Sequence, residues 1–132
     1  MKLSKRIGLF VVALVLAGCS SGLYGVRGKV VFEDGTPLDG GMVVFEHIDG
    51  AAKSSADGPI NTDGTFQLRT DAGEGVRAGK YRVLVRPKAR PTPELKRLPL
   101  VIHPKFERFE TSGIELVVEP KSNTFEIKVA KP

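Results

Sequence analysis

The sequence predicts an all-β protein, a single β-sandwich of about seven antiparallel strands. Apolar and polar residues alternate in several short segments, and Gly, Asp and Pro residues separate these segments. After residue 18, no stretch of ten or more residues has the 3.6-residue period of an amphipathic helix. Two antiparallel sheets, each with one face in water, would produce this pattern. Removing 18 of the 132 residues leaves 114, enough for one domain with a modest core.

The segments expected to form strands follow one another along the chain. In residues 26–32 the residues at even positions share one face, and Arg27 and Lys29 lie on the other. Residues 42–48 are apolar on both faces at positions 42–45, which predicts a central strand. Further strands are expected at residues 65–69, 80–86, 114–118 and 124–129.

Loops and turns are expected between these strands. Residues 49–60 are rich in Gly, Ala, Ser and Asp, which predicts a loop with room for one short edge strand. Residues 71–79 carry three glycines and predict another loop, and a long Pro-rich connection follows residue 86. Turns are expected at residues 33–37, 61–64 and 119–123.

The first 18 residues have the three parts of an export signal. Basic residues at positions 2, 5 and 6 precede an apolar run at 7–16, and Ala17 and Gly18 are the small residues expected at a cleavage site. An apolar helix of ten residues covers only about half of a bilayer core of roughly 30 Å, so we expect no permanent transmembrane helix here.

The stretch Leu16-Ala17-Gly18-Cys19 resembles the lipobox of bacterial lipoproteins. The resemblance implies that residues 1–18 are removed and that Cys19 is acylated, which would hold the chain on a membrane through a lipid anchor. Residues 19–25 would then be a lipidated tether, and residues 26–132 the folded domain. Ser20 resembles the residue that follows the cysteine in lipoproteins sent to the outer membrane. The expected location is the cell envelope, at the outer membrane, facing the periplasm or the cell surface. The alternative is an ordinary secreted protein with an accidental cysteine.

The net charge of +5 belongs partly to the signal segment. That segment holds three of the 20 Lys and Arg residues and no acidic residue, so 17 basic residues remain against 15 acidic ones, a net of +2. Such a balance gives little support to a nucleic-acid partner, and none is expected. Cys19 is the only cysteine, so once it is acylated no thiol remains for a disulfide bond or a metal site.

Several segments resemble carboxypeptidase regulatory-like domains. The two clearest are Thr62-Asp63-Gly64-Thr65-Phe66-Gln67-Leu68 and Ala78-Gly79-Lys80-Tyr81-Arg82-Val83-Leu84-Val85. Residues 26–30 and 34–45 are similar to the first hairpin of that family, and residues 104–127 to small bacterial lipoproteins that carry this domain alone. The resemblance implies an immunoglobulin-like, transthyretin-like sandwich with an accessory or adhesive role, and it brings no catalytic residues.

Candidate metal and catalytic residues are few. His47 and His103 are far apart in sequence and have no neighbour at metal-ligand spacing. The acidic residues of the expected loops, which a sandwich could gather at one end as a calcium site, are Asp57, Asp63, Asp71 and Glu74. No Gly-x-Ser-x-Gly elbow is present, and the chain end lacks the Tyr-Arg-Gly-Ser signature of the hydrolase branch of transthyretin-like proteins. We therefore expect no enzyme activity and no cofactor.

The strongest surface feature is a basic run in the Pro-rich connection. It consists of Arg86, Lys88, Arg90, Lys96 and Arg97, with Glu94 as the only acidic residue among them. Prolines keep such a loop extended, which lowers the entropy lost on binding. One interpretation is a contact for an anionic envelope polymer, lipid head groups or an acidic protein face. The other is a solvated loop whose charges keep an edge strand from pairing.

These observations favour a non-catalytic, membrane-anchored lipoprotein that binds or scaffolds an envelope protein or polysaccharide. The first alternative is a carbohydrate- or calcium-dependent ligand-binding module built on the acidic loops. A hydrolase is the second alternative.

Overall fold

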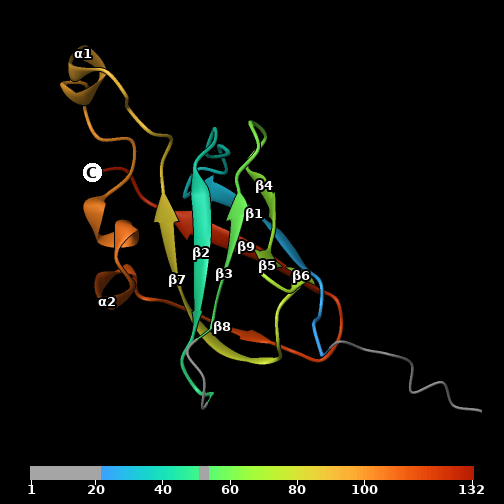
Figure 1. The fold of residues 1–132 in the computed structure, drawn as a ribbon. Coiled ribbons are helices and arrows are strands. Elements are labelled where there is room, and N and C mark those ends of the chain that lie inside the picture. The colour runs from blue at the N-terminus through green and yellow to red at the C-terminus, as the bar shows by residue number, and fades with distance from the viewer. Residues whose placement is uncertain (1–21, 51–53) are drawn as a thin grey trace, which may run out of the picture.

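A computed structural model describes residues 22–50 and 54–132 of the chain and consists mainly of two β-sheets packed face to face (Figure 1). One sheet has three strands in the order β4-β1-β9, and the other has six in the order β6-β5-β3-β2-β7-β8. The prediction of an all-β sandwich is confirmed. Cys19 and the signal segment lie outside the described residues.

The strands are β1 (Val26–Phe32), β2 (Met42–His47), β3 (Ser55–Pro59), β4 (Thr65–Gln67), β5 (Arg69–Thr70), β6 (Gly73–Glu74), β7 (Gly79–Arg86), β8 (Ile114–Val118) and β9 (Asn123–Val129). The connection between β7 and β8 contains three short helical turns, α1 (Pro93–Lys96), η1 (Pro104–Glu107) and α2 (Phe109–Ser112). Within the described ranges, no helix has the length and apolar character needed to span a membrane.

The core lies between the two sheets and is built by the predicted alternation. Val26 and Val30 of β1 are fully buried, while Arg27 and Lys29 between them are exposed. Phe45 of β2 stands at the centre, with its ring centroid 5.9–6.4 Å from those of three other aromatic residues, Phe66, Tyr81 and Phe125. Tilted aromatic contacts at these distances stabilise a core beyond the burial of apolar area.

The prediction that residues 42–48 form a central strand is confirmed. β2 pairs with β3 on one side and with β7 on the other, both antiparallel. The pairing with β7 runs from Met42 opposite Arg86 to His47 opposite Tyr81. β2 therefore supports β7 along almost its whole length, including the end from which the Pro-rich connection leaves.

The expectation of antiparallel pairing throughout is wrong for one pair of strands. β9 runs parallel to β1, from Val26 opposite Asn123 to Phe32 opposite Val129. β8 lies in the six-stranded sheet, and the turn after it carries the chain across to the other sheet, where β9 enters beside β1. Alternation along a strand has the same period in parallel and antiparallel sheets, so it could not show this.

Two expected loops contain strands. β3 lies inside the six-stranded sheet between β2 and β5, and β6 forms an edge of the same sheet. Gly58 in β3 is required by close packing, because a Cβ atom there would lie 2.5 Å from the backbone oxygen of Gln67. The sequence of β3, Ser-Ala-Asp-Gly-Pro, has the composition of a turn. A short edge strand was expected within residues 49–60, but β3 lies inside the sheet and pairs on both sides.

The segment 65–69, expected as one strand, is divided between the two sheets. β4 pairs with β1, whereas Arg69 of β5 pairs with Asp57 of β3. Leu68 lies between them and is fully buried, and its backbone nitrogen donates to the oxygen of Val26. The inward orientation predicted for Phe66 and Leu68 is confirmed.

Candidate functional site

The basic run lies on a projection that extends beyond the end of β7. We call residues 86–101 the basic lobe. In Figure 1 it carries α1 and rises at the end of the molecule opposite to the start of the described chain. All residues from 91 to 101 are exposed, and the chain returns to the core at Ile102, which is buried.

Local interactions give the basic lobe a defined shape. Thr92 caps α1, with its Oγ1 accepting from the backbone nitrogen of Leu95 at 3.3 Å. Pro93 occupies the first helical turn, where its fixed φ favours the helix and its missing N–H is not needed. No side chain of α1 is buried. The shape of the lobe is therefore set by its own caps and prolines and not by packing against the core.

Arg90 joins the two halves of the basic lobe. Its guanidinium donates from Nη1 to the backbone oxygen of Leu98 at 2.6 Å and from Nη2 to that of Pro99. These carbonyls follow α1, whereas Arg90 precedes it, so the side chain closes the lobe at its base. The sequence placed Arg90 among ligand contacts, but in the structure two of its donors serve the lobe itself.

The other four basic side chains of the run divide into two groups. Lys88 Nζ lies 3.7 Å from Asp39 Oδ1, and both side chains are well exposed. Arg86, Lys96 and Arg97 form no ion pair with any carboxylate of the described ranges. The structure thus places four of the five predicted residues on the projection and Arg86 at its base, at the last position of β7. Three of the five are available to an anionic partner.

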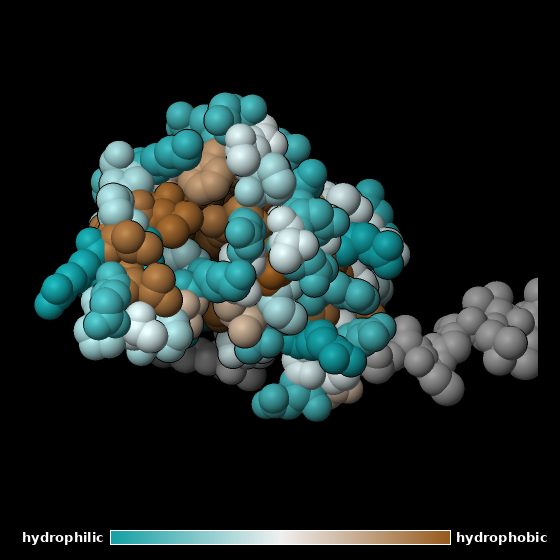
Figure 2. Space-filling model, turned by 90° about the horizontal axis from the view of Figure 1, so that it is seen from above, coloured by the Kyte–Doolittle hydropathy of each residue, from teal (hydrophilic) through white to brown (hydrophobic). Residues whose placement is uncertain are grey.

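Sequence reasoning missed the apolar side chains of the basic lobe. Leu95, Leu98, Leu100 and Val101 are 42%, 54%, 52% and 41% exposed. Only Ile48 and Val117 are comparably exposed large apolar residues in the rest of the described chain. Figure 2 looks onto this end and shows hydrophobic side chains gathered on one side, bordered by hydrophilic ones. The signal in the sequence was a group of four large aliphatic residues within the seven positions 95–101. It was missed because their spacing matches neither a strand nor a helix.

A groove of about 280 Å³ runs along the base of the basic lobe. Pro87 and Ala89 line it from the first half of the lobe, and Leu100 and Val101 from the second. Lys88 and Lys96 stand along it, with Glu107 of η1. The lining of the groove therefore combines apolar side chains with several cations and one carboxylate.

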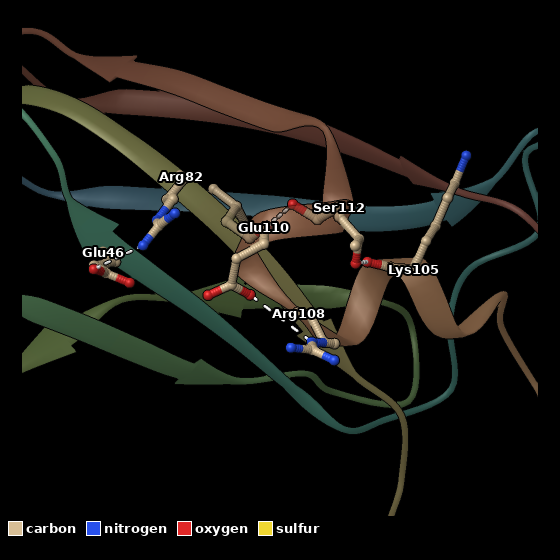
Figure 3. Close-up of polar contacts among 8 residues, drawn as sticks. Glu46, Arg82, Lys105, Arg108, Glu110 and Ser112 are labelled. Carbon is tan, nitrogen blue, oxygen red and sulfur yellow. Dashed lines mark hydrogen bonds and ion pairs between the residues drawn. The ribbon is translucent and has the colours of Figure 1, made fainter.

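The rest of the connection is fastened to the sheet (Figure 3). The hydroxyl of Ser112 in α2 is buried and donates to the backbone oxygen of Val83 in β7. Thr111 Oγ1 donates to the backbone oxygen of Lys105 at 2.7 Å, which joins α2 to η1. Arg82 on β7 lies 3.2 Å from Glu46 and 5.4 Å from the ring centre of Phe109. These contacts attach η1 and α2 to each other and to β7, whereas α1 of the basic lobe buries none of its side chains.

His47 and His103 have structural neighbours. The ring of His47 stacks on Tyr81 with centroids 4.8 Å apart, and its Nε2 lies 2.7 Å from Asp49 Oδ1 without hydrogen-bond alignment. His103 Nδ1 accepts from the backbone nitrogen of Lys105 and caps η1.

Of the four acidic residues weighed as calcium ligands, Asp63 and Glu74 have side-chain contacts of their own. Asp63 accepts from the backbone nitrogen and the hydroxyl of Thr65. Asp57 lies opposite Arg69, whose Nη2 is 3.8 Å from Glu74 Oε1. In residues 22–50 and 54–132, no three His, Cys, Asp or Glu side chains form a group suited to a metal ion.

Two shifted pKa values lie at the opposite end of β7 from the basic lobe. A hydrogen bond from the backbone nitrogen of Lys80 lowers the pKa of Asp49 below its usual value of 3.8. Burial raises the pKa of Tyr81, whose hydroxyl donates to the backbone oxygen of Arg77 at 2.8 Å. Both groups use their polar atoms within the fold.

The chain has no significant match among family models, curated proteins or solved structures. The resemblance to carboxypeptidase regulatory-like domains therefore stays a prediction. So does the acylation of Cys19, which lies outside the described residues.

Proposed function

We propose that the chain is a non-catalytic bacterial lipoprotein, anchored through acylated Cys19, that binds a component of the cell envelope through the basic lobe. The carboxypeptidase regulatory-like identity and the location at the outer membrane belong to the same proposal. Its domain would be an accessory module, as in the family that it resembles. The anchor rests on the lipobox, and the binding role rests on the lobe.

The observation that carries the binding role is the combination found on the basic lobe. Exposed aliphatic side chains and unpaired cations are both costly to gather on a surface that has no partner, because the first favour aggregation and the second repel one another. Elsewhere in the described chain, large apolar side chains are mostly buried in the core. The lobe is also held in one shape by Arg90 and Thr92, which lowers the entropy lost when a partner binds.

Replacing Cys19 tests the anchor. We expect Cys19→Ser to abolish incorporation of a palmitate analogue and to move the protein from the membrane fraction to the soluble fraction. Ser20→Ala is the matched control, since it changes a neighbouring residue and keeps the thiol. Continued labelling of Cys19→Ser would contradict the anchor.

Replacing the unpaired cations tests the binding role. A photocrosslinking residue at position 98 should join the protein to an envelope component, and Arg86→Ala, Lys96→Ala and Arg97→Ala together should remove that product. The matched control replaces Arg27, Lys29 and Lys128, which lie on the three-stranded sheet. Equal crosslinking in both triple variants would count against the lobe as the binding site.

A further inference from the structure

We infer that the basic lobe docks on a bilayer surface that contains anionic phospholipid, with its aliphatic side chains in the interface. The inference deepens the proposed function by naming the partner of the lobe. Only the orientation of the sandwich on the bilayer, described below, rests on the proposed acyl anchor, because lipid binding by the lobe needs no acyl chain.

The first argument is the shape and chemistry of the tip. Leu95 and Leu98, 42% and 54% exposed, belong to the projecting part of the lobe, whereas Leu100, 52% exposed, also lines the groove at its base. A projecting set of aliphatic side chains can enter the boundary between head groups and acyl chains without a complementary cavity. The core of a protein interface, by contrast, is enriched in aromatic residues. Residues 86–101 contain no Phe, Tyr or Trp, which favours lipid as the partner.

The second argument is charge. Residues 86–101 hold five basic residues and one acidic residue. Arg86, Lys96 and Arg97 are unpaired among the described residues. Lys96 and Arg97 lie between the exposed Leu95 and Leu98 in the sequence. Basic residues beside an apolar face attract anionic lipid and orient the apolar side chains toward the bilayer. A zwitterionic bilayer offers no such attraction.

The position of the basic lobe gives the orientation. In Figure 1 the lobe and the start of the described chain lie at opposite ends of the sandwich. Tyr24, near that start, pairs with Val76 at the far end from α1. Residues 20–25 could reach at most about 20 Å when extended. An anchor at one end and a lipid contact at the other would therefore lay the sandwich lengthwise along the bilayer.

The test uses residues 20–132, which lack Cys19 and the signal segment. We expect this part to fold without the signal segment, because the nine strands and the core of the described residues all lie within it. Its sedimentation is measured with vesicles of phosphatidylglycerol and phosphatidylethanolamine and with vesicles of phosphatidylcholine alone. We expect binding to the first and much weaker binding to the second. Binding should weaken as salt is raised above about 0.15 M.

Two sets of variants locate the contact. Removing Arg86, Lys96 and Arg97 should lower the partition coefficient on the order of a hundredfold, at roughly fivefold for each cation. Leu98→Glu should lower it at least about tenfold. The matched controls are the triple variant of Arg27, Lys29 and Lys128, and Val117→Glu on β8, where Val117 is 56% exposed. Both controls should bind like the parent, and circular dichroism should show all variants folded.

Some outcomes would overturn the inference. These are no sedimentation with phosphatidylglycerol vesicles at low salt, or equal losses in the lobe variants and their controls. If vesicle binding is absent while the crosslink at position 98 persists in the envelope and identifies a protein, the partner is that protein and the lipid proposal is wrong. Failure of palmitate labelling would contradict the anchor and leave the vesicle result standing, so the two proposals fail separately.

Discussion

The polar and apolar groups at the two ends of β7 have opposite environments. Where β7 begins, Tyr81 is buried, its hydroxyl donates to Arg77, and Asp49 accepts from the backbone of Lys80. Where β7 ends, the chain leaves the sheet, leucines are exposed, and Arg86, Lys96 and Arg97 form no ion pair within the described chain. The first end has the contacts that folding needs. The second exposes apolar area that folding alone would bury.

This difference separates structural residues from candidate binding residues. A polar group with its partners inside the fold is explained by stability. The aliphatic residues of the basic lobe contribute little to the core, so a partner is the better explanation for them. Arg90 is the exception within the lobe, because its donors serve the lobe itself.

The largest effect is expected in the core beside the first end of β7. Phe45→Ala should lower the free energy of unfolding by about 3–5 kcal/mol, because it leaves a cavity among Phe66, Tyr81 and Phe125. Leu98→Ala is the contrasting change and should alter it by less than about 0.5 kcal/mol. Urea unfolding measures both. A loss for Leu98→Ala as large as that for Phe45→Ala would show that the lobe belongs to the core.

A smaller effect is expected from the residue that closes the basic lobe. Arg90→Ala removes two hydrogen bonds to backbone carbonyls, and we expect this to lower the free energy of local opening of the lobe by about 1 kcal/mol. Amide exchange at Lys96, Arg97 and Leu98, whose amides donate within α1, should then become roughly fivefold faster.

Lys88→Ala is the matched control for Arg90→Ala. Its ion pair with Asp39 is exposed and should contribute little. Unchanged exchange in Arg90→Ala would show that the hydrogen bonds of Arg90 do not hold the lobe.

The smallest effect is expected from Asp49, whose exposed carboxylate accepts a hydrogen bond near the start of β7. The pKa of Asp49 is lower in the folded chain than its usual value of 3.8, so folding favours the carboxylate. The stability that Asp49 contributes is complete above the unfolded pKa and is lost as the pH falls through the folded pKa. The wild type should therefore be more stable than Asp49→Asn at about pH 6, and this difference should shrink as the pH falls below 3.8 through the lowered pKa of Asp49 in the folded chain.

Comparing wild type and Asp49→Asn across pH isolates this residue. The pKa values of Asp34 and Asp63 are also lowered, by hydrogen bonds from Thr36 and Thr65, and they remain the same in both proteins. A difference between the two proteins that stays constant as the pH falls well below 3.8 would mean that the charge of Asp49 does not stabilise the fold.

The sequence by itself determined where most strands lie and which of their residues are buried. Alternation in β1, β7 and β9 is a local property, so it marked Val30, Val83 and Ile127 as core residues without knowledge of their partners. At β3 the turn-like Gly and Asp indicated at most a short edge strand, whereas β3 lies inside the sheet, where the backbone of Gln67 leaves no space for a Cβ atom at Gly58. The basic run of the lobe was likewise evident as a charge pattern.

The contacts between strands and loops that are remote in sequence could be known only from the folded structure. The parallel pairing of β1 and β9 depends on two segments nearly a hundred residues apart in sequence. The role of Arg90 depends on carbonyls that become its neighbours only after the lobe turns back. Whether Leu98 is covered depends on whether any remote segment packs against it, and in the described chain none does so fully. The periodicity of a segment shows which of its faces is apolar, whereas the exposure of a residue depends on which other segments pack against it.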